Sequence, residues 1–107
     1  LLATYRGLLV ETDLFYGCPI GSLALELHEP DPQVRELIAA NFTNWTQAVK
    51  RCLDAAGLAE RTDTLALAEL VLNVMEGGVM QTRSHRDIDH FDRAVGQLRN
   101  YLDCLKA

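Results

Sequence analysis

The sequence is poor in cysteine, proline and aromatic residues, and each scarcity narrows the class of protein. The 107 residues include three cysteines, three prolines and seven aromatic residues, namely one Trp, three Tyr and three Phe. The cysteines, Cys18, Cys52 and Cys104, are odd in number and form no Cys-x-x-Cys pair. This usage argues for reduced thiols in a cytoplasmic protein and against a disulfide framework. All three prolines precede residue 33, and alanine and leucine dominate, which is the profile of a helical bundle.

Long hydrophobic runs and excess positive charge are also missing. No run of eighteen apolar residues occurs, so no membrane span is predicted, and no basic segment precedes an apolar one at the start, so no secretory signal is predicted. Ten Lys and Arg stand against fifteen Asp and Glu, for a net charge of −5. DNA binding depends on clusters of Lys and Arg, so these residues are not expected to contact DNA. Because Leu1 already lies within a helical pattern, we expect the chain to be part of something longer.

Apolar residues recur at helical spacing throughout, and no strand pattern or internal repeat is present. Asp31 is expected to cap a long helix that has Pro32 in its first turn, and Gly57 is expected to end it. Asp63 or Thr62 is expected to cap the next helix. The sequence therefore predicts an all-α fold with five helices, at residues 1–13, Pro19–His28, 32–56, Thr64–Ser84 and Asp87–Leu105.

The third and fourth of these helices differ in how much of their surface is apolar. The polar stripe of the fourth helix is narrow, chiefly Glu69, Asn73 and Glu76. A helix that is apolar on nearly all sides must be covered on nearly all sides, which suggests a second subunit. The third helix has one apolar face, made of Val34, Leu37, Ile38, Phe42, Trp45, Ala48, Val49, Cys52, Leu53 and Ala56.

The fifth helix carries a heptad seam. Its apolar residues are spaced 3-4-3-4-3, which is typical of helices that pack side by side. The preceding loop, residues 84–86, is so short that the last two helices must form an antiparallel hairpin. Two such hairpins related by a two-fold axis would form a four-helix bundle. The seam consists of Ile88, Phe91, Val95, Leu98, Leu102 and Leu105.

Residues 17–27 read Gly-Cys-Pro-Ile-Gly-Ser-Leu-Ala-Leu-Glu-Leu. Pro19 suits a first helical turn, and Gly21 lets another backbone pass close by. This phrase, the long helix that starts at a proline, the run Met75-Glu76-Gly77-Gly78 and the closing helix pair resemble the regulatory half of TetR/AcrR-type transcriptional regulators. The resemblance covers essentially all 107 residues.

The resemblance implies that residues 1–107 form a C-terminal ligand-binding and dimerisation domain of five helices. The family's helix-turn-helix DNA-binding domain would precede Leu1 and is not present in this sequence. A homodimer would hold a palindromic operator through that domain, and a small effector would release the DNA, so the protein would act as a repressor. The last two helices would form the four-helix-bundle dimer interface through Leu72, Val79, Phe91, Val95, Leu98 and Leu102.

An effector pocket is the main predicted site. Aromatic and methionine side chains suit an apolar small molecule. Ordinary core packing is the alternative interpretation for each residue taken singly, and Trp45 is the strongest candidate. Asn41, Asn44 and Asn73 are candidates for polar contacts with the ligand, or for solvated or interhelical roles. The predicted pocket residues are Phe15, Tyr16, Leu23, Phe42, Trp45, Val49, Met75 and Met80.

Other chemistry has weaker support. Asp87 and His90 share a helical face, as in a di-iron bundle, but no second motif matches, and a capped, charged first turn explains them. Cys18 at a helix start has no histidine nearby to activate it. We therefore expect no enzyme activity, cofactor or metal. A helical dimeric metal-binding or enzyme bundle and a ligand-free dimerisation module are the alternatives. Gly77 and Gly78 interrupt a helix, either for close helix contact or to leave room for a ligand.

Overall fold

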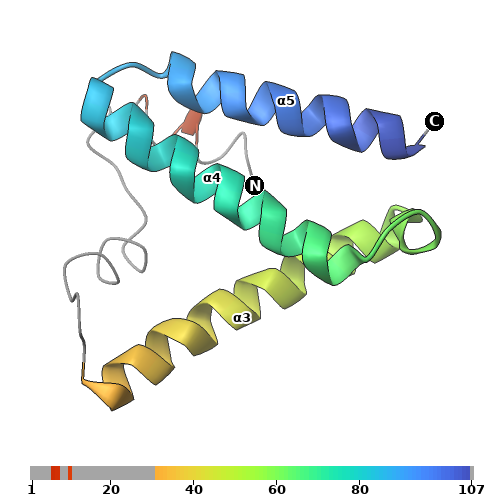
Figure 1. The fold of residues 1–107 in the computed structure, drawn as a ribbon, viewed down its shortest axis with the longest axis horizontal. Helices are drawn as coiled ribbons and strands as arrows, with labels where there is room; N and C mark the ends of the chain where they lie inside the picture. Colours follow the sequence, from red (N-terminus) through yellow and green to blue (C-terminus); the bar gives the residue numbers. More distant parts are fainter. Residues whose placement is uncertain (1–5, 8–9, 11–30, 107) are drawn as a thin grey trace. The chain divides into compact units, whose positions relative to one another are not determined.

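The computed structural model describes Arg6, Gly7, Val10 and residues 31–106, and no strand occurs among these residues. The predicted all-α class is therefore confirmed for the described part of the chain. The third, fourth and fifth predicted helices form within a few residues of their expected bounds, whereas the expected helix Pro19–His28 and most of residues 1–13 lie outside the described residues. In chain order the elements are α3 (Pro32–Ala55), the short 3-10 helix η1 (Leu58–Glu60), α4 (Thr64–His85) and α5 (Asp89–Lys106) (Figure 1).

The described residues belong to two compact units. One unit holds α3, η1 and the first half of α4, as far as Leu72. The other unit holds the second half of α4 from Asn73, all of α5, and the three described residues near the start of the chain. α4 is one continuous helix that runs through both units.

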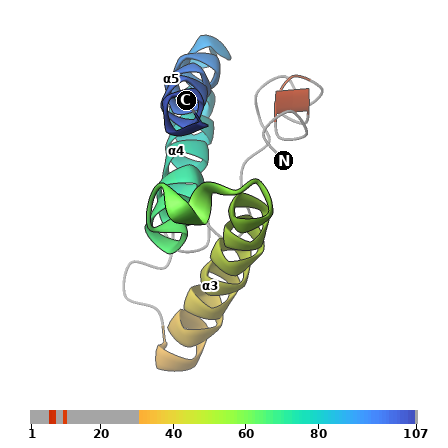
Figure 2. The same ribbon diagram turned by 90° about the vertical axis from the view of Figure 1, so that its right-hand side faces the viewer.

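The ends of α3 are those that the sequence predicts. The Asp31 carboxylate caps the helix, because its Oδ1 accepts a hydrogen bond from the Gln33 backbone N–H at 2.8 Å, and Pro32 occupies the first turn. Gly57 has a φ of 81°, the left-handed conformation that glycine adopts at low cost, and it lies between α3 and η1. Figure 2 shows the chain turning there from α3 toward α4.

The buried stripe of α3 is narrower than the predicted apolar face. Ile38 is buried and Phe42 and Trp45 are half-buried, whereas Leu37 is 65% exposed. Ala48, Cys52 and Ala56, also predicted to face the core, are exposed. The reason is helical geometry: a row at intervals of three and four residues stays on one side, and Leu37 lies about 100° away from Ile38. The row consists of Val34, Ile38, Phe42, Trp45, Val49 and Leu53, and the buried Thr46 lies beside it.

A carboxylate joins the end of α3 to the start of α4. Asp54 Oδ2 accepts a hydrogen bond from Lys50 Nζ at 2.7 Å, and Oδ1 accepts one from the buried Thr64 Oγ1 at 2.6 Å. Asp63 caps α4, since its Oδ1 accepts from the backbone N–H of Leu65 at 3.0 Å and of Ala66 at 3.2 Å. Of the two predicted caps for this helix, Asp63 is therefore the one that forms.

The second half of α4 and α5 form the predicted antiparallel hairpin (Figure 1). A Cβ placed on Gly78 would lie 3.2 Å from Phe91 Cδ2, so glycine is what allows the Phe91 ring to lie directly on α4. The buried Thr82 hydroxyl accepts a hydrogen bond from the Phe91 backbone N–H at 3.1 Å, which satisfies a donor that the first turn of α5 leaves free. Between the helices Arg86 has a φ of 55°, a left-handed conformation that is uncommon for a residue with a side chain.

A described residue near the start of the chain also contacts α5. The Arg6 guanidinium donates from Nε to Asp92 Oδ1 at 2.8 Å and from Nη2 to Oδ2 at 3.1 Å. This two-bond geometry is specific for arginine with a carboxylate, and it raises the pKa of Arg6. The pair is largely exposed, so it orients the two segments more than it stabilises them.

The two adjacent glycines of α4 should respond differently to alanine. Nothing lies within 4 Å of a Cβ on Gly77, so Gly77→Ala is expected to raise the free energy of unfolding by about 0.5–1 kcal/mol through helix propensity. In Gly78→Ala the new methyl meets Phe91, so the gain is expected to be smaller or reversed. Chemical denaturation of both variants measures the difference. Equal effects would contradict close packing of Phe91 on Gly78.

The Asp54 contacts predict how stability depends on pH. Hydrogen bonds from Lys50 and then Thr64 lower the pKa of Asp54 below its ordinary value. A carboxyl group with a lowered pKa in the folded state stabilises the fold above its unfolded-state pKa of about 3.9, and this contribution is lost as the pH falls further. About pH 6 and about pH 3 lie on either side of that pKa. Between them, the melting temperature of Asp54→Asn should therefore fall less than that of the wild type. The exposed Asp103 supplies the control, because Asp103→Asn should leave the wild-type dependence unchanged.

Candidate functional site

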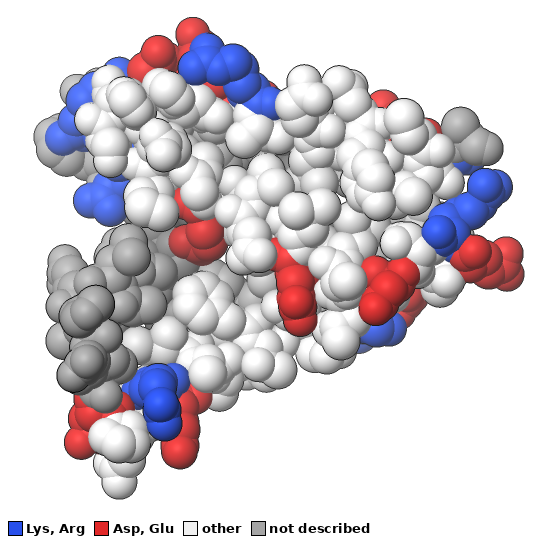
Figure 3. Space-filling view, in the orientation of Figure 1, with Lys and Arg blue, Asp and Glu red and all other residues white. Residues whose placement is uncertain are grey.

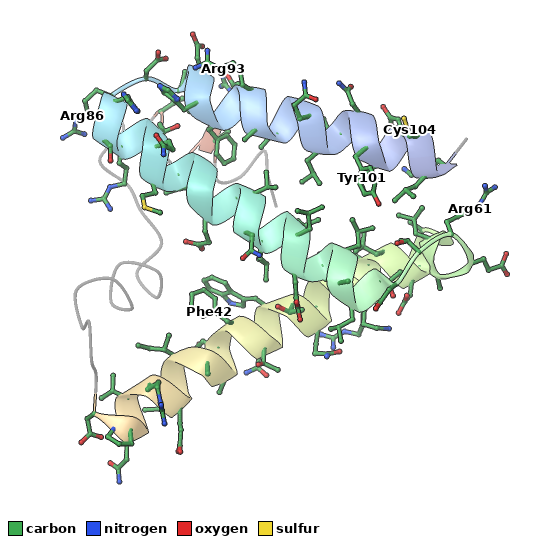
Figure 4. All side chains as sticks on the ribbon, viewed as in Figure 1. Phe42, Arg61, Arg86, Arg93, Tyr101 and Cys104 are labelled. Carbon is green, nitrogen blue, oxygen red and sulfur yellow. The ribbon has the colours of Figure 1, made fainter. Side chains whose placement is uncertain are left out.

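Three predicted pocket residues lie in one row on α3. Phe42 and Trp45 contact each other edge to face, with ring centroids 6.1 Å apart and an interplanar angle of 87°. Val49 follows one turn after Trp45, and all three side chains are half-buried. Phe42 is labelled on α3 in Figure 4. Because edge-to-face aromatic pairs are rigid and apolar while their exposed edges stay accessible, this row could contact an apolar molecule.

The other predicted pocket residues are distributed elsewhere. Met75 and Met80 lie on the second half of α4, where Met75 is 1% exposed and Met80 is 47% exposed. Phe15, Tyr16 and Leu23 lie outside the described residues. The contact that the structure shows within the predicted set is thus that of Phe42 with Trp45, and the pocket as a whole stays a prediction.

The predicted polar contacts have simple positions. Asn41 Nδ2 donates to the Leu37 backbone carbonyl at 2.9 Å, so this amide is engaged within its own helix. Asn44 and Asn73 are exposed. Asn73 is the one of these three that belongs to α4. It lies on the same side of that helix as Glu76, three residues later, and Met80, four residues after Glu76.

Glu76 is the residue whose environment could not be predicted from its sequence pattern. In the polar stripe of α4, Glu69 and Asn73 are exposed, but Glu76 is half-buried, and its Oε1 is enclosed with no hydrogen-bond partner among the described residues. An enclosed acceptor without a partner costs about 1–3 kcal/mol. The sequence did contain one signal of this burial. Glu76 lies directly between Met75 and Gly77 in the most apolar of the described helices.

Most residues of the predicted dimer interface are buried within the single chain. Phe91 packs on Gly78, and Val95 and Leu98 continue the same buried face of α5. Leu72 and Val79 are buried on α4, whereas Leu102 is half-buried. Within one chain, Phe91, Val95 and Leu98 of the heptad seam are thus buried, whereas Ile88, Leu102 and Leu105 are half-buried. The subunit contact itself stays a prediction.

A different side of the hairpin is made of exposed and half-buried residues and carries no Lys, Arg, Asp or Glu side chain. On α5 it comprises His90, Ala94, Gln97, Tyr101 and Cys104, about 60–140° round the helix from Phe91. Tyr101 and Cys104 are labelled near the end of α5 in Figure 4. On α4 the adjoining uncharged stripe comprises Val74, Gly77, Gln81 and Ser84. The two stripes lie on the same side of the hairpin, because the rings of His85 and His90 stack there with centroids 4.2 Å apart. We call these nine residues the uncharged hairpin face.

The histidine-rich turn has the structural role that its sequence favours. Asp87 Oδ1 accepts a hydrogen bond from the Asp89 backbone N–H at 2.9 Å, and Asp89 and Asp92 lie in the first turn of α5. This confirms the interpretation of Asp87 as part of a capped, charged helix start. His85 Nε2 lies 3.1 Å from Gln81 Oε1. Across residues 31–106 and the three earlier described ones, no group of three or more His, Cys, Asp or Glu side chains could hold a metal ion.

No helix within the described part of the chain is long and apolar enough to cross a membrane.

Comparison with known proteins places this sequence in a family. Residues 1–97 match the family described as "Transcriptional regulator LmrA/YxaF-like, C-terminal domain", which is of the TetR type. The HTH-type transcriptional regulators MT0206 and Rv0196, from two strains of Mycobacterium tuberculosis, are each 33% identical to this chain over 110 residues. The alignments cover 95% of this chain and 55% of each relative, so the chain spans about half the length of the curated relatives it matches. No solved structure matches.

The matched residues include all of α3 and α4 and the first half of α5, so the family assignment applies to the same elements that the structure describes. The chain belongs to the TetR family of transcriptional regulators, and it carries that family's LmrA/YxaF-like C-terminal domain.

Proposed function

We propose that residues 1–107 are the ligand-binding and dimerisation region of a cytoplasmic repressor. A small, mostly apolar effector binds this region, and a helix-turn-helix region preceding Leu1 binds a palindromic operator as a homodimer. Effector binding releases the DNA. The observation that carries this proposal is the match of residues 1–97 to the C-terminal domain of LmrA/YxaF-like regulators. The net charge of −5 agrees with DNA contact by other residues, and no catalytic role is assigned.

The uncharged hairpin face is the surface we propose for the dimer. Gly77 and Ala94 are small, so two copies of the hairpin could approach closely there, and Tyr101 adds a large side chain that is 44% exposed. The charged residues of α5 lie on its other sides. Figure 3 shows a mostly uncharged surface over the middle of α5. This choice replaces the heptad residues as contact residues while keeping the predicted four-helix bundle of two hairpins.

The effector site we propose retains the eight predicted residues, with the Phe42 and Trp45 pair as its aromatic part. Trp45 is the single tryptophan of the chain, so its emission reports on this row alone. A half-buried aromatic pair gains further apolar burial when a ligand covers it.

A charge placed on the uncharged hairpin face should break the dimer. Ala94→Glu and Tyr101→Glu put a carboxylate where two copies would meet, and an unpaired buried charge is strongly unfavourable. Both variants are expected to sediment as monomers while keeping the helical circular dichroism of the wild type. Sedimentation velocity measures the mass.

The matched control is Arg99→Glu, an exposed position on another side of α5, which should leave the dimer intact. Leu98→Asp is a poor test of the interface, because Leu98 is 4% exposed within one chain and its replacement should unfold the hairpin. A dimer that persists in both Ala94→Glu and Tyr101→Glu would show that another surface joins the subunits.

Trp45 should couple ligand binding to DNA release. In the protein together with its DNA-binding region, the neutral apolar probe N-phenylnaphthylamine is expected to quench Trp45 emission. The same probe should weaken binding to a fragment of the protein's own promoter by roughly 5-fold to 150-fold, the usual range of coupling between sites. Fluorescence titration and gel-shift assays measure the two effects.

Trp45→Ala should weaken probe binding, whereas Leu37→Ala, at an exposed apolar position of the same helix, should not. A probe that releases DNA from Trp45→Ala with unchanged affinity would place the effector site elsewhere.

A further inference from the structure

Glu76 has an enclosed carboxylate oxygen that none of the described residues satisfies. Its Oε1 accepts no hydrogen bond from them, although buried acceptors in folded proteins nearly always have a partner. The ion pairs that the described residues form are Arg6 with Asp92 and Lys50 with Asp54, and neither involves Glu76. An unsatisfied buried acceptor calls for an explanation, such as a water molecule or a ligand.

The position of Glu76 on α4 excludes the hairpin seam as the cause. Gly78, which lies against Phe91, is two residues further along and therefore about 200° round the helix. α5 thus packs on nearly the opposite side of α4. The uncharged hairpin face, which contains Gly77, also points away from Glu76 by about 100°. Glu76 consequently belongs to a third side of α4, separate from both packing surfaces.

That side of α4 combines polar and apolar groups. Asn73 and Met80 are the neighbours of Glu76 at three residues before and four after, where helical side chains meet, and both are exposed. Val79, three residues after Glu76, is buried and apolar. A carboxylate flanked by an amide, a thioether and aliphatic carbon offers a strong acceptor beside surface that an apolar body can cover.

We propose that Glu76 is the anchor for a positively charged group of the effector, an organic amine with an apolar body. The inference rests on the proposed function and adds the chemical class of the ligand. A protonated amine supplies both the hydrogen-bond donor that Oε1 lacks and a charge opposite to that of the carboxylate, and such charge-assisted hydrogen bonds are about twice as strong as neutral ones. An anionic ligand would be repelled by Glu76.

Three probes of matched shape test the proposal on the full-length protein. Phenylbutylamine is protonated at neutral pH, phenylbutanol is uncharged, and phenylbutyrate is an anion. Calorimetry is expected to show the amine binding the wild type about tenfold more tightly than the alcohol, with the acid weakest. In Glu76→Gln that preference should disappear while the alcohol keeps its affinity within about twofold, since glutamine keeps the shape and removes the charge.

Glu69→Gln is the matched control, because Glu69 lies on the same side of α4 two turns earlier and is exposed. This variant should keep the wild-type preference for the amine. That preference is about tenfold in affinity, because one hydrogen bond to a charged group contributes roughly that much to binding. Thermal melting should show that Glu76→Gln is folded and no less stable than the wild type, since a charge without a partner is removed from an enclosed oxygen. A merely structural Glu76 would change stability without changing the order of the three probes.

Three results would overturn the proposal. Equal affinity of the amine and the alcohol for the wild type would rule out Glu76 as a charged anchor, and it would still be compatible with an apolar effector site. An amine preference that survives in Glu76→Gln would assign the selectivity to another group. Failure of all three probes to bind would reject this ligand class, and the separate assay with N-phenylnaphthylamine and promoter DNA would then decide whether the proposed function also fails.

Discussion

The contact of Phe91 with Gly78 is the constraint on which the hairpin depends. A glycine in the middle of a helix is unfavourable by about 1 kcal/mol relative to alanine, and the close approach of an aromatic ring offsets that cost. Thr82 lies one turn after Gly78 and also contacts Phe91, because the Thr82 hydroxyl accepts a hydrogen bond from the Phe91 backbone N–H. Once this end of the seam is in place, the heptad spacing aligns the remaining apolar residues of α5 on one face.

Burial of the seam within one chain has a consequence for assembly. Phe91, Val95 and Leu98 of the heptad seam are already used to join two helices, which is why we propose that a partner meets another side of the hairpin. The uncharged hairpin face and the side bearing Glu76 differ in chemistry: the first is neutral and contains small residues, and the second contains an unsatisfied acid.

Some features followed from local chemistry and could be predicted directly. Asp31, Asp63 and Gly57 act through hydrogen bonds and backbone conformations within a few residues of themselves, so their roles were readable from the sequence. The width of the buried face of α3 could not be predicted in this way, because Leu37 and Cys52 are side chains that occur both in protein cores and at exposed positions. Trp45 was predicted as a pocket residue, and its edge-to-face contact with Phe42 follows from their three-residue spacing on a helix.

The helical class, the caps and the short antiparallel turn could be predicted from the amino-acid sequence, since they depend on spacing and local residue type, and the TetR likeness came from a resemblance to that family. The folded chain was needed to show which apolar residues are covered, that Gly78 and not Gly77 meets Phe91, and that Glu76 has an enclosed oxygen. Periodicity assigns a residue to a side of its helix, whereas burial depends on which other segments pack against that side.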